Sequence, residues 1–132
     1  MIKLIASDID ETIIRDDQIV PERNKKAIKE AIDKGIIVML ATGRGPYEIF
    51  DIPKQAGVIA DDRYVICCNG AVIMNVKTKE IIDVVDMDFS YARNVFNFAY
   101  ENKLTFYIYT LDKKYGLNLS DETIVAEKHI NI

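Results

Sequence analysis

Two apolar runs of strand length, separated by one amphipathic helix, restrict the folds open to this chain more than any other feature. The first run covers residues 2–7 and the second, IIVMLA, covers residues 36–41. Polar residues hardly interrupt either run, so we expect both faces of each strand to be covered. Between the runs, Pro21 opens a helix that ends at Gly35. Its apolar face consists of Ala27, Ile28, Ala31 and Ile32. This order predicts a right-handed βαβ unit with parallel strands.

The remainder of the first half continues this pattern and then departs from it. A short helix is expected over residues 47–55, weakened by Pro53, and a third strand over residues 64–68. Residues 71–76 and 81–85 read as the two strands of a hairpin. The first 85 residues are therefore predicted to form an α/β domain, a Rossmann-like parallel sheet built on three strands.

The second half reads as the start of an α+β unit, with the boundary near residues 83–88. Ser90 is the expected N-cap of a helix over residues 91–102. A strand rich in β-branched and aromatic residues is expected over residues 104–110, and residues 115–119 are expected to pair with it. A last short helix is expected to begin at Ser120 or Asp121. We assign residues 1–85 to the first domain and 86–132 to the second.

Composition excludes several classes of protein. The 132 residues are 49% hydrophobic and 29% charged, which is typical of a globular chain, and the net charge of −4 with scattered basic residues argues against nucleic-acid binding. No apolar run approaches the roughly 20 residues that a membrane span needs, and no signal peptide is recognised, so we expect a cytoplasmic protein. Cys67 and Cys68 are adjacent and read as buried or core thiols, while His129 has no metal-ligand spacing around it.

The chemistry of the chain lies where the two apolar runs end. Asp8 and Asp10 follow the first run, and as residues i and i+2 of an extended segment they point the same way. Two carboxylates that close repel unless a cation lies between them, and Mg²⁺ suits a site of few carboxylates, phosphate and water. One carboxylate could then attack phosphorus and the other exchange a proton with the leaving oxygen.

Thr42, Gly43 and Arg44 follow the second run and suit the binding of a phosphate group. A hydroxyl and an accessible backbone N–H at a strand end are phosphate donors, and glycine lets the backbone approach closely. Arg44 could pair with the phosphate or form a salt bridge to an acidic neighbour. Taken singly, Asp-x-Asp and Thr-Gly-Arg are weak motifs that a capped turn also explains. Their conjunction at neighbouring strand ends is much more specific.

These residues resemble the haloacid dehalogenase (HAD) superfamily, and their arrangement looks like its Cof-type sugar-phosphatase branch. The matching segments are Asp8-Ile9-Asp10-Glu11-Thr12, KGIIVMLATGR at residues 34–44 and CNGAVI at residues 68–73. The resemblance implies a phosphatase of small phosphorylated metabolites with Asp8 as nucleophile and Mg²⁺ ligand. It implies Asp10 as general acid/base and as a further ligand through its backbone carbonyl. Thr42 and Gly43 would bind phosphate, and Asn69 would face the site. Glu11 stands where this branch often has glycine.

The resemblance also covers only the first half of such an enzyme. Nothing after Thr110 matches the lysine or the acidic loop that complete the family's site. We therefore expect a weak Mg²⁺ site, a partial cap in residues 86–132, and an exposed edge on the first strand that favours a homodimer or poor solution behaviour. Two alternatives remain: a truncated module that binds phosphate or metal weakly without catalysis, and a receiver-like domain phosphorylated on Asp8. The cap-like second half disfavours the latter.

Overall fold

The computed structural model describes residues 1–49, 51–126 and 130–131. The chain divides into two compact units, Met1–Val84 and Val85–Ile132, and each is described by itself. Of the described residues, none belongs to a helix long and apolar enough to cross a membrane. His129 lies outside the described residues.

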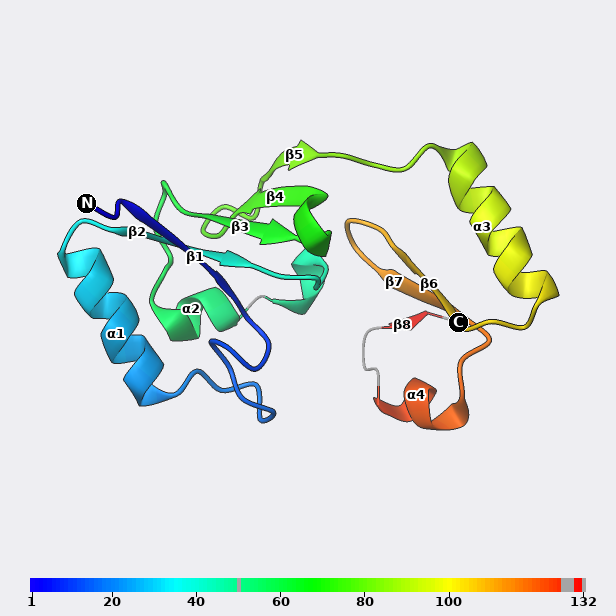
Figure 1. Cartoon of the computed structure of the whole chain (residues 1–132), viewed down its shortest axis with the longest axis horizontal. Helices are drawn as coiled ribbons and strands as arrows, with labels where there is room; N and C mark the ends of the chain where they lie inside the picture. The colour runs from blue at the N-terminus through cyan, green and yellow to red at the C-terminus, as the bar shows by residue number, and fades with distance from the viewer. Residues whose placement is uncertain (50, 127–129, 132) are drawn as a thin grey trace. The chain divides into compact units, whose positions relative to one another are not determined.

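The first unit is a five-stranded sheet with the strands in the order β1-β2-β3-β4-β5 (Figure 1). The first three strands are parallel and the last two are antiparallel to their neighbours. The strands are β1 (Leu4–Asp8), β2 (Ile37–Ala41), β3 (Tyr64–Cys67), β4 (Val72–Asn75) and β5 (Ile81–Val84). The predicted α/β fold, with its βαβ unit, third parallel strand and hairpin, is confirmed.

The helices of this unit pack on one face of the sheet. Helix α1 (Glu22–Asp33) connects β1 to β2, and the 3₁₀ helix η1 (Pro46–Glu48) and helix α2 (Ile52–Ala56) precede β3. Pro21 is the N-cap of α1 and lies just outside the helix. The buried side chains of these helices join those of the sheet in one core, whose members include Ile28, Val38, Leu40, Ile52, Ala56 and Val65. The opposite face carries the side chains of Met39, Ala41 and Ile66, which are only half-buried.

The expectation that both faces of the first strand are covered is wrong for this chain. Leu4 is 49% exposed and Ile5 is 39% exposed. The reason is the position of β1 at the edge of the sheet, where β2 is its single neighbouring strand among the described residues. The apolar residues of β2 are buried on the face that the helices cover, as predicted. An apolar sequence does not show, however, whether other residues cover the remaining face or edge of a strand.

The described part of the second unit contains two helices and a small three-stranded sheet in the order β6-β7-β8. Strands β6 and β7 are antiparallel, and β8 runs parallel to β7. The elements are α3 (Phe89–Glu101), β6 (Phe106–Tyr109), β7 (Lys114–Leu117), α4 (Asp121–Ala126) and β8 (Ile130–Asn131).

The predicted N-cap of helix α3 is wrong by two residues. Asp88 is the N-cap, and its carboxylate accepts a hydrogen bond from the Ser90 backbone N–H at 2.8 Å and another from the Ser90 hydroxyl. The Asp88 carboxylate thereby satisfies a backbone N–H of the first turn that has no partner within the helix. The prediction had given this role to the Ser90 hydroxyl. These two hydrogen bonds from Ser90 also lower the pKa of Asp88 below its ordinary value.

Candidate active site

The register of the parallel strands brings the two predicted motifs together. Asp8 at the end of β1 is paired with Ala41 at the end of β2, so Thr42 leaves the sheet next to Asp8. The Thr42 N–H donates to the Ile66 carbonyl at 2.9 Å, which ties this residue to β3 as well. Carboxyl ends of parallel strands are the usual place for a ligand in an open α/β sheet. The two motifs therefore lie side by side, as the predicted βαβ unit requires.

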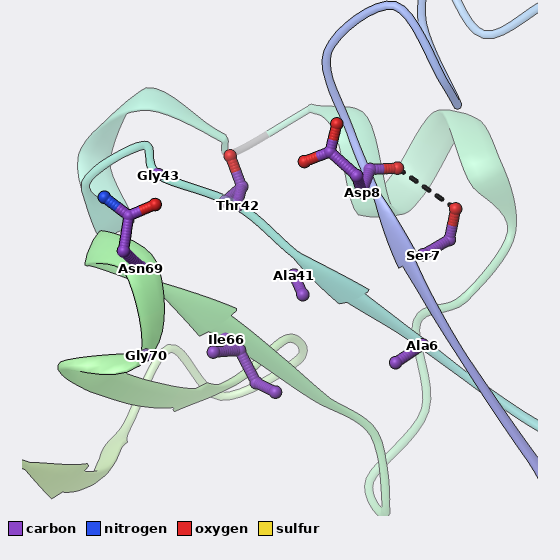
Figure 2. Close-up of a pocket in the computed structure, with 9 residues that line it drawn as sticks. All are labelled: Ala6, Ser7, Asp8, Ala41, Thr42, Gly43, Ile66, Asn69 and Gly70. Atoms are coloured by element: carbon purple, nitrogen blue, oxygen red, sulfur yellow. Dashed lines mark hydrogen bonds between the residues drawn. The ribbon is translucent and has the colours of Figure 1, made fainter.

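A cavity of about 370 Å³ opens at these strand ends (Figure 2). Its lining consists of Ala6, Ser7, Asp8, Ala41, Thr42, Gly43, Ile66, Asn69 and Gly70. Ala6, Ala41 and Ile66 form an apolar floor contributed by β1, β2 and β3. In Figure 2 the Asp8 carboxylate and the Thr42 hydroxyl lie at the same end of the cavity. Four of the six predicted site residues line this cavity.

Asp8 presents an exposed carboxylate to solvent at the cavity. One of its oxygens accepts a long hydrogen bond of 3.4 Å from the Thr12 hydroxyl. Its backbone carbonyl accepts a hydrogen bond of 3.1 Å from the Ser7 hydroxyl. The carboxylate is oriented from one side by Thr12 and keeps acceptor capacity for a ligand.

The hydroxyl of Thr42 is held in an orientation that suits donation to a ligand. Its oxygen accepts a hydrogen bond of 3.1 Å from the Arg44 backbone N–H, and its side chain is buried. Because the oxygen already accepts this bond from within the loop, the hydroxyl proton remains available for an acceptor in the cavity. An anion such as phosphate is an acceptor of that kind.

Asn69 belongs to a tight turn that closes the far side of the cavity. Cys68, Asn69 and Gly70 all have positive φ angles, of 51°, 54° and 101°. Asparagine and glycine tolerate this left-handed conformation better than other residues do. The Asn69 N–H donates to the Thr42 carbonyl at 3.1 Å, and Figure 2 shows its side-chain amide beside Gly43. The turn therefore holds the amide group at the mouth of the cavity.

Asp10 and Arg44 are not among the residues that line the cavity. Instead they bind each other: the Arg44 Nε donates to Asp10 Oδ2 at 3.1 Å, and Arg44 Nη2 contacts Asp10 Oδ1 at 2.5 Å. Of the two possibilities left open for Arg44 by the sequence, this chain shows the salt bridge to an acidic neighbour.

The loop that carries Asp10 is fixed by a residue that the sequence analysis did not single out. Asn24, in the first turn of α1, donates hydrogen bonds to the carbonyls of Thr12 at 3.1 Å and Ile13 at 3.0 Å. The side chain of Ile9, between the two aspartates, is fully buried and anchors the loop to the core. From the sequence alone, an asparagine in the first turn of a helix gives little reason to expect bonds to a preceding loop, because such residues often face solvent.

The two cysteines next to the site are free thiols. Burial raises the pKa of Cys67 to about 12, and burial, followed by the charge of Glu48, raises the pKa of Cys68. A thiol with a raised pKa is protonated near neutrality and is a poor nucleophile. The predicted core role of Cys67 is confirmed by its complete burial.

The oxygen atoms at the site suit Mg²⁺ in kind but are few in number. Asp8 offers an exposed carboxylate at the cavity, whereas the Asp10 carboxylate is engaged by Arg44. Hard oxygen donors are the ligands that Mg²⁺ selects. Within residues 1–49, 51–126 and 130–131, however, no group of three or more acidic, histidine or cysteine side chains is gathered for a metal. The described residues therefore offer oxygen donors of a suitable kind, but too few to form a complete metal site by themselves.

Comparison with known proteins identifies the family. Residues 5–131 match the model of the haloacid dehalogenase-like hydrolases. This chain belongs to the haloacid dehalogenase-like hydrolase family. Among individual relatives, the Bacillus subtilis protein YxeH is 27% identical over 131 residues, which is 98% of this chain and 48% of YxeH. The family resemblance stated from the sequence is therefore confirmed.

Two further comparisons show how the likeness is distributed. A Bacillus subtilis protein named 5-amino-6-(5-phospho-D-ribitylamino)uracil phosphatase YcsE is 54% identical over 43 residues, covering 33% of this chain and 17% of YcsE. The solved structure of a haloacid dehalogenase-like hydrolase from B. subtilis has a TM-score of 0.79 and 24% identity, covering 95% of this chain and 42% of that one. Where nearly all of this chain is matched, as by YxeH and by this solved structure, the chain spans about half the length of the relative.

Proposed function

We propose that this chain carries the nucleophile and phosphate-binding half of a Mg²⁺-dependent phosphatase that acts on small phosphorylated metabolites. The observation that carries the proposal is the placement of Asp8 and Thr42 at adjacent strand ends on one cavity. Membership of the hydrolase family supports it, as do relatives named as phosphatases. We further propose that residues 1–85 are the catalytic core, that residues 86–132 are part of a cap, and that the protein is cytoplasmic.

In the proposed reaction, Asp8 and Asp10 divide the work between them. An Asp8 carboxylate oxygen attacks phosphorus and forms an aspartyl phosphate, while the bond from phosphorus to the leaving oxygen breaks. The leaving oxygen takes a proton from Asp10 and departs as an alcohol. Water then attacks phosphorus and gives its proton to Asp10, and the bond to Asp8 breaks to release inorganic phosphate. Atoms and protons balance over the two steps.

The remaining residues would bind the phosphate group. The Thr42 hydroxyl has a proton to donate, the Gly43 backbone lies at the same rim, and the Asn69 amide adds a further donor. Fixed donors aimed at a phosphoryl group are worth several kcal/mol in the transition state. Mg²⁺, when bound by Asp8 and the Asp10 carbonyl, would neutralise phosphate charge. We expect weak metal binding because the described ligands are few.

The substrate class follows from the relatives and is itself a proposal. YcsE is named for a phosphorylated ribitylamino-pyrimidine, a small metabolite with a phosphate ester on a polyol chain. A phosphate monoester of this size is compatible with a cavity of about 370 Å³. A screen of phosphorylated sugars and polyols would rank the candidates.

Hydrolysis of p-nitrophenyl phosphate with and without Mg²⁺ tests the activity. We expect turnover that needs Mg²⁺ and disappears in Asp8→Asn. Asp16→Asn is the matched control, because Asp16 is an exposed acid of the same loop and lies outside the cavity. The absence of turnover in the wild-type chain, or equal turnover in Asp8→Asn, would contradict the proposal.

A second candidate is a module that keeps the scaffold without catalysis. It is favoured by one observation, the small number of metal ligands among the described residues. Under this alternative, isothermal titration would detect weak binding of phosphate or Mg²⁺ while p-nitrophenyl phosphate is not hydrolysed. The receiver-like alternative is set aside by the family match over residues 5–131.

We also propose that two copies of the chain pair through strand β1. This strand is at the edge of its sheet and exposes Leu4 and Ile5. An apolar edge strand presents unpaired backbone groups that favour pairing with another chain. Sedimentation should show a dimer that Leu4→Lys shifts toward monomer, because a charged edge side chain discourages pairing. A monomer at high concentration would contradict this proposal.

A further inference from the structure

The pair formed by Arg44 and Asp10 has a geometry that fixes the orientation of a carboxylate. Arg44 Nε donates to one oxygen of Asp10 and Nη2 to the other, at 3.1 and 2.5 Å. Two parallel N–H···O bonds from one guanidinium define both the position and the plane of the carboxylate, which a single charge does not. The Asp10 side chain is 49% exposed, so without this contact it would be free to rotate into solvent.

Arg44 is itself held from several directions. Its backbone N–H donates to the Thr42 hydroxyl at 3.1 Å, and its carbonyl accepts from the Cys68 N–H at 2.9 Å. The next residue, Gly45, donates its N–H to Glu48 Oε2 at 2.7 Å, and Arg44 Nη1 approaches the Glu48 carbonyl at 3.5 Å. The Arg44 side chain is only 22% exposed. Arg44 therefore acts as a fixed support, and Asp10 is the partner whose freedom is reduced.

We propose that Arg44 is a positioning residue for Asp10, and that it does not bind the phosphate. This inference rests on the proposed function, in which Asp10 exchanges a proton with the leaving oxygen. The Nε and Nη2 donors of Arg44 already serve Asp10, and Arg44 is absent from the lining of the cavity that holds Asp8 and Thr42. Arg44 of the Thr-Gly-Arg segment thus binds Asp10 of the Asp-x-Asp motif and not the phosphate anion.

The effect of Arg44 should appear in the chemical step. A partly exposed ion pair contributes little to folding stability. In contrast, a displacement of a catalytic group by about 1 Å can lower a rate by about 100-fold. We therefore expect Arg44→Gln to lower kcat by about 10- to 100-fold and to change KM and the inhibition constant of inorganic phosphate by less than about twofold. Arg44→Lys keeps the charge but loses the two-point contact, and we expect an intermediate kcat.

The decisive experiment is a double-mutant cycle with Asp10. We would measure kcat, KM and phosphate inhibition for the wild-type chain, Arg44→Gln, Asp10→Asn and the double variant. If Arg44 acts through Asp10, Arg44→Gln has no further effect on kcat in the Asp10→Asn background. Arg15→Gln is the matched control, because Arg15 forms an ion pair of 2.9 Å with Asp17 in the same loop and lies outside the cavity. It should leave all three parameters unchanged.

Two results would overturn the proposal. A phosphate inhibition constant that rises about tenfold in Arg44→Gln, with or without Asp10, would make Arg44 a phosphate ligand. If Arg44→Gln lowers kcat by the same factor in the Asp10→Asn background as in the wild-type chain, its effect does not pass through Asp10 and reflects general structural damage.

A spectroscopic test separates this inference from the proposed function, in case the wild-type chain has no turnover. The Nε–H resonance of Arg44, assigned by its absence in Arg44→Lys, should shift in Asp10→Asn. It should stay in place when inorganic phosphate is added at saturating concentration. A phosphate-dependent shift that persists in Asp10→Asn would show that Arg44 contacts the anion, and the positioning role would be rejected.

Discussion

Gly43 lies so close to Asn69 that a Cβ atom at position 43 would stand 3.1 Å from the Asn69 Oδ1. This contact joins the loop after β2 to the turn after β3 at the mouth of the cavity. Any side chain at position 43 must therefore push the Asn69 amide away. The glycine is required here for the approach of a neighbouring side chain.

The first prediction concerns this contact. Gly43→Ala should lower the free energy of unfolding by about 1 kcal/mol, because the added methyl group overpacks against Asn69. Asn69→Ala removes the crowded atoms, so Gly43→Ala should cost much less in that background. Urea denaturation of the four proteins measures the difference. Equal costs in both backgrounds would show that the strain lies in the backbone and not in the contact with Asn69.

The second prediction concerns a buried asparagine in the hairpin between β4 and β5. Asn75 Oδ1 accepts from the backbone N–H groups of Lys77 at 2.8 Å and Thr78 at 2.9 Å, and its Nδ2 donates to the Asp61 carbonyl at 2.8 Å. Asn75→Ala leaves these groups without partners and should lower the free energy of unfolding by about 2–3 kcal/mol.

Thr78→Ala is the control for Asn75. The Thr78 hydroxyl accepts one exposed bond of 3.3 Å in the same turn. Its loss should cost less than about 0.5 kcal/mol in urea denaturation. If the two variants lost similar stability, the hydrogen bonds of Asn75 would not be what holds the hairpin.

The third prediction concerns the residue between Asp10 and Thr12. Glu11 has a φ of 55°, a left-handed conformation that costs a residue with a Cβ atom about 1 kcal/mol. Glu11→Gly should raise the free energy of unfolding by roughly 0.5 kcal/mol, since the greater freedom of glycine in the unfolded chain offsets part of the gain. Glu11→Ala keeps the Cβ atom and should give no gain. Thermal unfolding of the three proteins would show whether only the glycine variant is more stable.

The fourth prediction is a pH dependence. The Ile19 backbone N–H, together with Arg15, lowers the pKa of Asp17 below its ordinary value of 3.8. A lowered folded-state pKa means that the ionised group contributes stability at pH values above its unfolded pKa. That contribution is lost as the pH falls through the folded-state pKa. Wild type should therefore be more stable than Asp17→Asn at neutral pH, and the difference should vanish once the pH has fallen through the lowered folded-state pKa of Asp17.

Urea denaturation at several pH values measures this effect for Asp17. Asp16→Asn is the control, because Asp16 forms no ion pair or side-chain hydrogen bond with any of the described residues. A difference between wild type and Asp17→Asn that persists unchanged at low pH would attribute the effect to something other than the ionised carboxylate.

Local pattern predicted the part of the site that depends on strand order. The apolar runs before Asp8 and Thr42 predicted adjacent parallel strands, and the register of those strands places the two residues on one cavity. It could not predict the partner of Arg44, because phosphate and the Asp10 carboxylate present similar acceptors to a guanidinium. The apolar pattern alone did not predict the exposure of Leu4, because composition records that a strand is apolar and only tertiary structure records what covers it. The exposed edge of this strand was expected from the partial family resemblance. The N-cap of α3 was misplaced because Asp88 and Ser90 are both residue types that cap helices, and the sequence alone did not decide between them.

The edge position of β1 has a consequence for how readily the site opens. The Ile37 N–H bonds to the Lys3 carbonyl, so alternate residues of β1 bond to β2 while the N–H groups of Leu4, Ala6 and Asp8 point away from it. Amide hydrogens of that second set should exchange with deuterated solvent far faster than those of β2. The proposed nucleophile is thus carried by one of the two edge strands of the sheet. Thermal fraying of β1 alone would release Asp8 while β2, β3 and β4 remain paired.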